Sequence, residues 1–205
     1  MRWRVTGPIL AGLMAMMTSC AQTSDESPAG PTALVERFFT ALEAGDSARF
    51  MALLDDDFVF RDPDSTFVVR KAAIPSMLEW DMAAGAHPVV SELRASGDTV
   101  HCTVRETNAF TDLLGLDPYV LDLTFVVREG RIREEVVSER VADGRSYTER
   151  FNEAVAPALA WAERNDPEAL GRIRDETGMR YDGESARALL DVIHAWREAT
   201  PTDER

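Results

Sequence analysis

The sequence predicts an α+β domain in which an antiparallel sheet stands between two groups of helices. Apolar residues recur at helical spacing up to residue 84, alternate at strand spacing from residue 88 to 140, and return to helical spacing after Gly144. Strands and helices therefore come in separate runs and do not alternate as βαβ units, which favours the α+β class over a parallel α/β sheet.

Three helices are expected before the sheet. The first ends at Gly45, the second is capped by Asp46, and the third covers about residues 72–84 and ends at Gly85. Between the last two, Phe58–Phe60 and Thr66–Arg70 flank a turn with the sequence Asp62-Pro63-Asp64, which predicts a short hairpin. The first helix carries an apolar stripe made of Leu34, Val35, Phe38, Phe39 and Leu42.

Four longer strands follow, two pairs of which are joined by the tight turns Gly97-Asp98 and Glu129-Gly130. Residues 108–117 form the one longer connection, and strands joined this tightly are antiparallel. The predicted strands are Pro88–Ser96, Thr99–Thr107, Pro118–Arg128 and Arg131–Arg140.

The C-terminal part is predicted to be helical over Tyr147–Arg164, from Asp166 to about Glu176, and over Glu184–Ala199. Pro157 predicts a kink or break in the first of these helices, because proline lacks the amide hydrogen that a helix interior requires.

Several short motifs of the first part resemble the cone-shaped fold of nuclear transport factor 2, ketosteroid isomerase and the SnoaL-like polyketide cyclases. They are Leu34–Asp46 with its Gly-Asp corner, Leu53–Asp57 followed by Phe60-Arg61-Asp62-Pro63, and Glu129–Ile132. The resemblance implies a domain over residues 32–142 whose curved sheet wraps around helices and leaves a pocket at its open end. Residues 143–205 are an extension that either caps the pocket or packs on the sheet.

The N-terminus resembles the export signal of bacterial lipoproteins. Arg2 and Arg4 precede a short apolar run, and small residues stand before Cys20, so residues 1–19 are predicted to be cleaved and Cys20 to carry lipid. Plain secretion is the alternative. Residues 20–31 are predicted to form the lipidated cysteine and a polar, flexible linker to the domain. A membrane contact through lipidated Cys20 and a location in the cell envelope, with the outer membrane favoured where one exists, follow from this prediction.

The charge of the chain bears on its partners. The net charge is −14, and removal of residues 1–19, which hold two arginines and no acid, would make it −16. Such a charge excludes nucleic acid as a partner. If Cys20 is lipidated, Cys102 has no partner for a disulfide and is expected to be a small buried side chain. The dispersed histidines show no ligand spacing, and neither a metal nor a cofactor is expected.

Asp62 is the candidate catalytic residue, because the resemblance places it where the isomerase has its general base. The alternative is a turn carboxylate that binds local backbone amides. The isomerase also needs acidic donors for the oxyanion, but its tyrosine falls on Phe38 and its aspartate near Leu123. Steroid isomerisation by that mechanism is therefore not expected.

Other side chains are candidates for the pocket. Glu106 continues the core-facing row of Val100, Cys102 and Val104, and either lines a pocket mouth or lies past the sheet edge in solvent. Glu134 has the same spacing from Ile132 and Val136, although Glu134-Glu135 could equally be a solvated pair. The candidate pocket residues are Phe38, Trp80, Glu106, Tyr119 and Glu134.

Three functions remain open. The favoured one is a lipid-anchored, non-catalytic module that binds a small apolar ligand or a partner segment. The second is an isomerase, cyclase or dehydratase that uses Asp62 as acid and base. The third is an envelope interaction protein, with the outer face of the sheet as a candidate homodimer surface. A cone filled by Phe38, Trp80 and Phe110 would weaken both ligand hypotheses.

Overall fold

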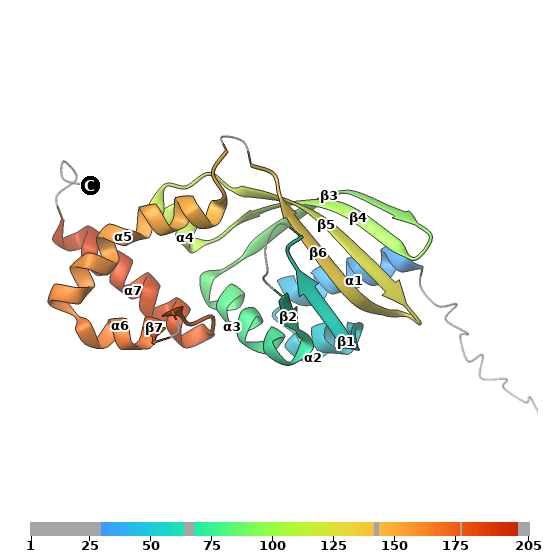
Figure 1. Ribbon diagram of the computed structural model, residues 1–205, viewed down its shortest axis with the longest axis horizontal. Coiled ribbons are helices and arrows are strands. Elements are labelled where there is room, and N and C mark those ends of the chain that lie inside the picture. Colours follow the sequence, from blue (N-terminus) through green and yellow to red (C-terminus); the bar gives the residue numbers. More distant parts are fainter. Residues whose placement is uncertain (1–29, 64–67, 142–143, 177, 201–205) are drawn as a thin grey trace, which may run out of the picture.

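A computed structural model of the chain describes residues 30–63, 68–141, 144–176 and 178–200. A curved six-stranded sheet wraps around the first helix, and a group of C-terminal helices lies beyond one end of the sheet (Figure 1). The predicted signal segment, Cys20 and the linker up to residue 29 fall outside the described residues.

The helices before the sheet follow the sequence prediction closely. They are α1 (Pro31–Glu43), α2 (Ser47–Leu53), the 3₁₀ turn η1 (Lys71–Ala73) and α3 (Ile74–Ala84). The carboxylate of Asp46 caps α2 by accepting a hydrogen bond from the Arg49 amide at 2.9 Å. Helix α3 ends at Gly85, whose φ of 65° lies in the left-handed region that glycine tolerates best.

The sheet has the strand order β2-β1-β6-β5-β4-β3. Strands β3 to β6 form an antiparallel meander, as predicted, but β1 and β6 pair in parallel, so the sheet is mixed and not purely antiparallel. After β1 and β2 the chain passes through α3 to the far edge of the sheet, where β3 lies. The meander β3 to β6 then leads back, so that β6 lies next to β1 and runs parallel to it. The strands are β1 (Leu54–Arg61), β2 (Val68–Arg70), β3 (His87–Ser96), β4 (Thr99–Thr107), β5 (Tyr119–Arg128) and β6 (Arg131–Glu139).

A bulge in β6 sets which of its side chains face the core. Val127 pairs with Ile132 while Val126 pairs with Glu134, so Arg133 is an extra residue without a partner on β5. An extra residue reverses the alternation of the strand beyond it. Ile132 and Glu135 are therefore both buried against the core.

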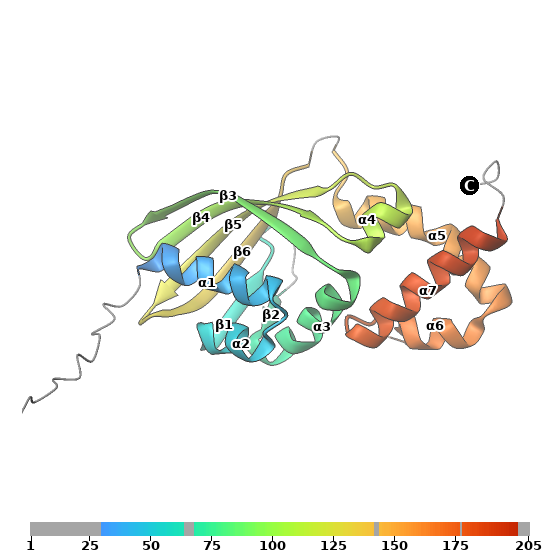
Figure 2. The same ribbon diagram turned by 180° about the vertical axis from the view of Figure 1, so that it is seen from behind.

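The extension is built from α5 (Tyr147–Asn165), α6 (Pro167–Ile173), the two-residue strands β7 (Arg174–Asp175) and β8 (Gly178–Met179), and α7 (Gly183–Ala199). A short helix α4 (Ala109–Leu114) occupies the predicted connection between β4 and β5. Helix α5 runs unbroken through Pro157, where a kink or break was expected. Figure 2 shows the extension beside α3 and α4, not on the face of the sheet.

Two hydrophobic cores result. The first lies between the sheet and α1 to α3; the second lies between α3, α4 and the helices of the extension. Helix α3 contributes to both, with Leu78 in the first core and Ala84 in the second. Among the described residues, none of the helices combines the length and the apolar character needed to span a bilayer.

Candidate functional site

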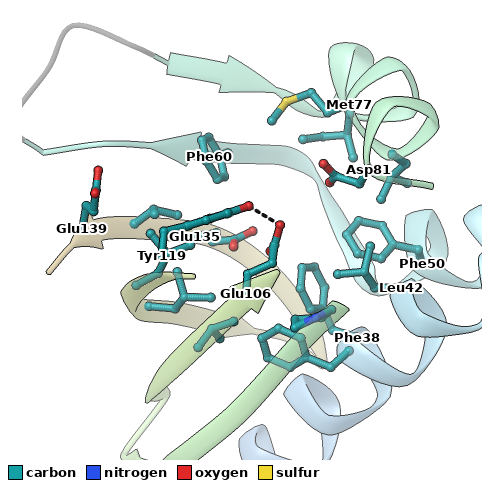
Figure 3. Close-up of a pocket in the computed structure, with 18 of the residues that line it drawn as sticks. Phe38, Leu42, Phe50, Phe60, Met77, Asp81, Glu106, Tyr119, Glu135 and Glu139 are labelled. Carbon is teal, nitrogen blue, oxygen red and sulfur yellow. Dashed lines mark hydrogen bonds between the residues drawn. The ribbon is translucent and has the colours of Figure 1, made fainter. Parts of the chain in front are cut away.

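A cavity of about 310 Å³ opens between the concave face of the sheet and helices α1 to α3 (Figure 3). Its size is that of a typical small-molecule site. Every strand from β3 to β6 contributes to it, together with β1 and four helices. The lining residues are Phe38, Phe39, Leu42, Phe50, Phe60, Ile74, Met77, Leu78, Asp81, Pro88, Val104, Glu106, Tyr119, Leu121, Leu123, Glu135, Val137, Glu139, Tyr147 and Thr148.

The inner end of the cavity is aromatic. The ring centroids of Phe38 and Phe50 are 4.4 Å apart, and Phe38 also contacts Phe125 at 5.2 Å. Phe38 and Phe125 are almost fully buried. Offset and edge-on packing of this kind is favourable for aromatic rings and holds the inner wall in place.

Glu106 and Tyr119 stand opposite each other on β4 and β5, and the Tyr119 hydroxyl donates a hydrogen bond to Oε1 of Glu106 (Figure 3). Directly opposed residues of an antiparallel pair share one face, which brings the two side chains together. Burial raises the pKa of Glu106, and the hydrogen bond from Tyr119 opposes this rise. Burial also raises the pKa of Tyr119 well above its ordinary value, so the phenol stays a donor.

Glu135 is the most buried carboxyl of the cavity. It lies on β6 opposite Phe125 and its side chain points into the cavity (Figure 3). Only 9% of the residue is exposed, and it has neither a hydrogen bond nor an ion pair with any residue that the structure describes. Burial, with smaller contributions from the charges of Asp81 and Glu106, raises the pKa of Glu135 to about 8.

Asp81 faces the same space from α3. It lies one helical turn after Met77, and both side chains line the cavity. Burial, followed by the charge of Glu106, raises the pKa of Asp81 to about 7. Asp81, Glu106 and Glu135, from three different elements, therefore line one cavity, with Glu139 as a fourth carboxyl at its mouth. The pKa values of Asp81 and Glu135 are near neutrality.

The extension supplies one side of the mouth. Tyr147 and Thr148 at the start of α5 line the cavity, and the ring centroid of Tyr147 lies 4.3 Å from that of Tyr119. The backbone amide of Tyr147 donates to Oε1 of Glu139 at 2.6 Å, and Nη2 of Arg150 lies 3.6 Å from the same oxygen. The extension therefore borders the mouth of the cavity and packs on helices α3 and α4.

Some of the candidate residues line the cavity and others lie outside it. Phe38, Glu106 and Tyr119 line the cavity. Glu134 is on the outer face of the sheet, where it accepts a hydrogen bond from Nε of Arg61, because the bulge turns it away from the core. Trp80 lies outside the cavity lining, since its side of α3 faces the second core.

Asp62 also lies outside the cavity lining. It follows the last residue of β1, is partly exposed, and takes part in interactions of its own. Its assignment as a general base stays a prediction.

Sequence reasoning missed Asp81 and Glu135. Asp81 stands in the largely apolar helix Ile74–Ala84, which also carries Glu79, so the sequence does not distinguish the acid of the cavity from the exposed one. Glu135 was considered only as part of a solvated pair, and its inward orientation depends on a bulge that the sequence of β6 alone does not mark. Within the described ranges, no group of three His, Cys, Asp or Glu side chains is arranged to hold a metal ion.

A family model covers most of the part of the chain that forms the sheet and the helices before it. Residues 35–135 match the family model described as SnoaL-like domain. Similar solved structures include a "putative ketosteroid isomerase" from Kribbella flavida, with 19% identity, coverage of 57% of this chain and 82% of that one, and a TM-score of 0.47. Another is IdmH, a "putative polyketide cyclase" from Streptomyces antibioticus, with 17% identity, coverage of 53% and 91%, and a TM-score of 0.46. Among curated proteins, none matches significantly.

Proposed function

We propose that this chain, in which residues 35–135 form a SnoaL-like domain, is a binding module that holds a small, mostly apolar molecule in the cavity of its curved sheet. The observation that carries the proposal is the cavity itself. About 310 Å³ of space remains open among side chains that are mostly aromatic or aliphatic. Apolar walls with a few convergent polar groups are typical of sites for small molecules.

Filling the cavity tests this function. Val137 lines the cavity on β6, whereas Val136 is its neighbour on the opposite face of the same strand. We expect the neutral fluorophore N-phenylnaphthylamine to bind the unmodified chain, Val137→Trp to weaken this binding about tenfold or more, and Val136→Trp to leave it unchanged. Fluorescence titration measures all three. Equal binding by the two variants would place the probe elsewhere and contradict the proposal.

The location of the module is part of the proposal. Lipid attachment at Cys20 is supported by the sequence that precedes this residue. In a bacterial host, the full chain should enter the detergent phase on Triton X-114 partitioning, and Cys20→Ser should leave it in the aqueous phase.

A second candidate function is proton transfer on the bound molecule. It is favoured by the pKa of about 7 for Asp81 beside the pKa of about 8 for Glu135, since near neutrality one can act as base and the other as acid. Tyr119 adds a hydroxyl donor at the same cavity.

Exchange of the protons next to the carbonyl of decalone into D₂O, followed by NMR, tests this candidate. We expect Asp81→Asn to abolish any exchange that the unmodified chain catalyses, and Asp62→Asn to preserve it. The reverse result would make Asp62 the base, as the family resemblance implies.

A further inference from the structure

The ionisable side chains that line the cavity are of one kind. They are acids and phenols, and the lining residues include no lysine, arginine or histidine. Arg150 at the mouth contacts the lining from outside, where its Nη2 lies 3.6 Å from Oε1 of Glu139. The carboxyls further inside, Asp81 and Glu135, have no ion pair with any described residue.

Glu135 adds an independent observation. It is nine-tenths buried, points into the cavity, and lacks a donor of its own among the described residues. A buried carboxyl without a partner is costly, and such groups are ordinarily hydrogen-bonded or paired. The carboxyl of Glu135 is therefore suited to accept a hydrogen bond from a donor group of a ligand.

We propose that the ligand of this cavity is a hydrophobic amine, whose ammonium group lies among Asp81, Glu106 and Glu135 and whose apolar body lies against Phe38, Phe50 and Phe60. The proposal rests on the binding function proposed above and names the class of molecule bound.

Charge and shape both favour an amine. An ammonium donates up to three hydrogen bonds, and Glu135, which has no donor among the described residues, can accept one of them. Its attraction to a carboxylate is far stronger inside a protein than in water, while a carboxylate or phosphate ligand would be repelled by the same groups. Phenyl and phenol rings beside the carboxyls add cation–π attraction, which increases on desolvation.

Binding should release protons. Without a ligand, the raised pKa values of Glu135 and Asp81 keep part of these carboxyls protonated at neutral pH. A bound ammonium favours their ionised forms, so its affinity should rise from about pH 6 to about pH 9. Asp81 on α3 and Cys102 and Glu106 on β4 interact electrostatically with Glu135. The other charged and titratable groups of the cavity and its mouth are Tyr119 on β5, Glu139 on β6, and Tyr147 and Arg150 on α5.

Three probes of the same shape test the proposal on the full chain: naphthylethylamine, naphthylethanol and naphthylacetate. Calorimetric titration at pH 7.5 should give an affinity for the amine about tenfold higher than for the alcohol, with no binding of the acid. In buffers of different ionisation enthalpy, the amine should release protons. Glu135→Gln should remove most of the preference for the amine. Glu134→Gln, the same substitution at the adjacent residue on the outer face, should preserve it.

The outcomes separate the two proposals. Equal binding of amine and alcohol would overturn the amine proposal and leave the binding function standing. An equal loss in Glu134→Gln would also overturn it, because the preference would then come from the overall negative charge. If neither the probes nor N-phenylnaphthylamine bind, the binding function itself fails.

Discussion

Replacing Glu135 by glutamine is expected to raise the melting temperature at pH 8 by several degrees. The folded chain holds the pKa of Glu135 at about 8, against 4.5 for an ordinary glutamate. Below about pH 4.5 the carboxyl is protonated in both states and costs nothing extra. As the pH rises towards 8, only the unfolded chain ionises freely, so the folded state loses up to roughly 4 kcal/mol of stability. Glutamine stays neutral and removes this loss.

Melting curves at pH 5 and pH 8 check the prediction. The difference between Glu135→Gln and the unmodified chain should be small at pH 5 and large at pH 8. Glu134→Gln is the matched control, because it changes the adjacent glutamate, which lies on the outer face beside Arg61. We expect that variant to lower stability by at most about 1 kcal/mol at either pH. A Glu135→Gln variant less stable than the unmodified chain at pH 8 would show that the carboxylate has a favourable partner.

Periodicity could predict the strands and part of the site. Glu106 continues an apolar row on β4, and this alternation left it either at a pocket mouth or in solvent past the sheet edge; in the structure it lines the cavity. The same reasoning gave the wrong side for Glu134, because alternation holds only while each residue has a partner on the next strand. Arg133 lacks such a partner on β5, and the register between two strands is not written in either strand alone.

Asp81 was not predictable for a different reason. Helix α3 buries two faces, one towards the cavity through Met77 and Asp81, the other towards the extension through Trp80 and Ala84. The exposed side of α3 carries the apolar Met82 beside Glu79, so polar and apolar residues do not separate into one exposed and one buried side of the helix. The position of the extension beside α3 had to be known before the two faces could be told apart.

The extension therefore acts on the site in two ways, by packing against α3 and by supplying one side of the cavity mouth. Trp80 of α3 packs on the side of the helix that faces away from the cavity. Its ring centroid lies 5.2 Å from that of Tyr181 in the extension and 5.4 Å from that of Phe110 in α4. The extension also places Tyr147 at the mouth. A change at the contact between the two cores should thus affect stability strongly, while the cavity keeps its lining.

Trp80→Ala tests this division of roles. Loss of the indole removes contacts with both α4 and the segment before α7, and we expect a cost of about 3 kcal/mol, or a melting temperature lower by roughly 5–10 °C. Because Trp80 does not line the cavity, the affinity for N-phenylnaphthylamine should stay unchanged well below the melting temperature. Calorimetry and fluorescence titration measure the two effects separately.

Met77→Ala is the matched variant on the other face of the same helix. It shortens a side chain that lines the cavity, so the probe should bind several-fold more weakly, with a smaller loss of stability than in Trp80→Ala. Weakened binding in Trp80→Ala without loss of folded protein would mean that the second core controls the shape of the cavity. The proposed separation would then fail, and α3 would have to be treated as one element that transmits changes in the extension to the ligand site.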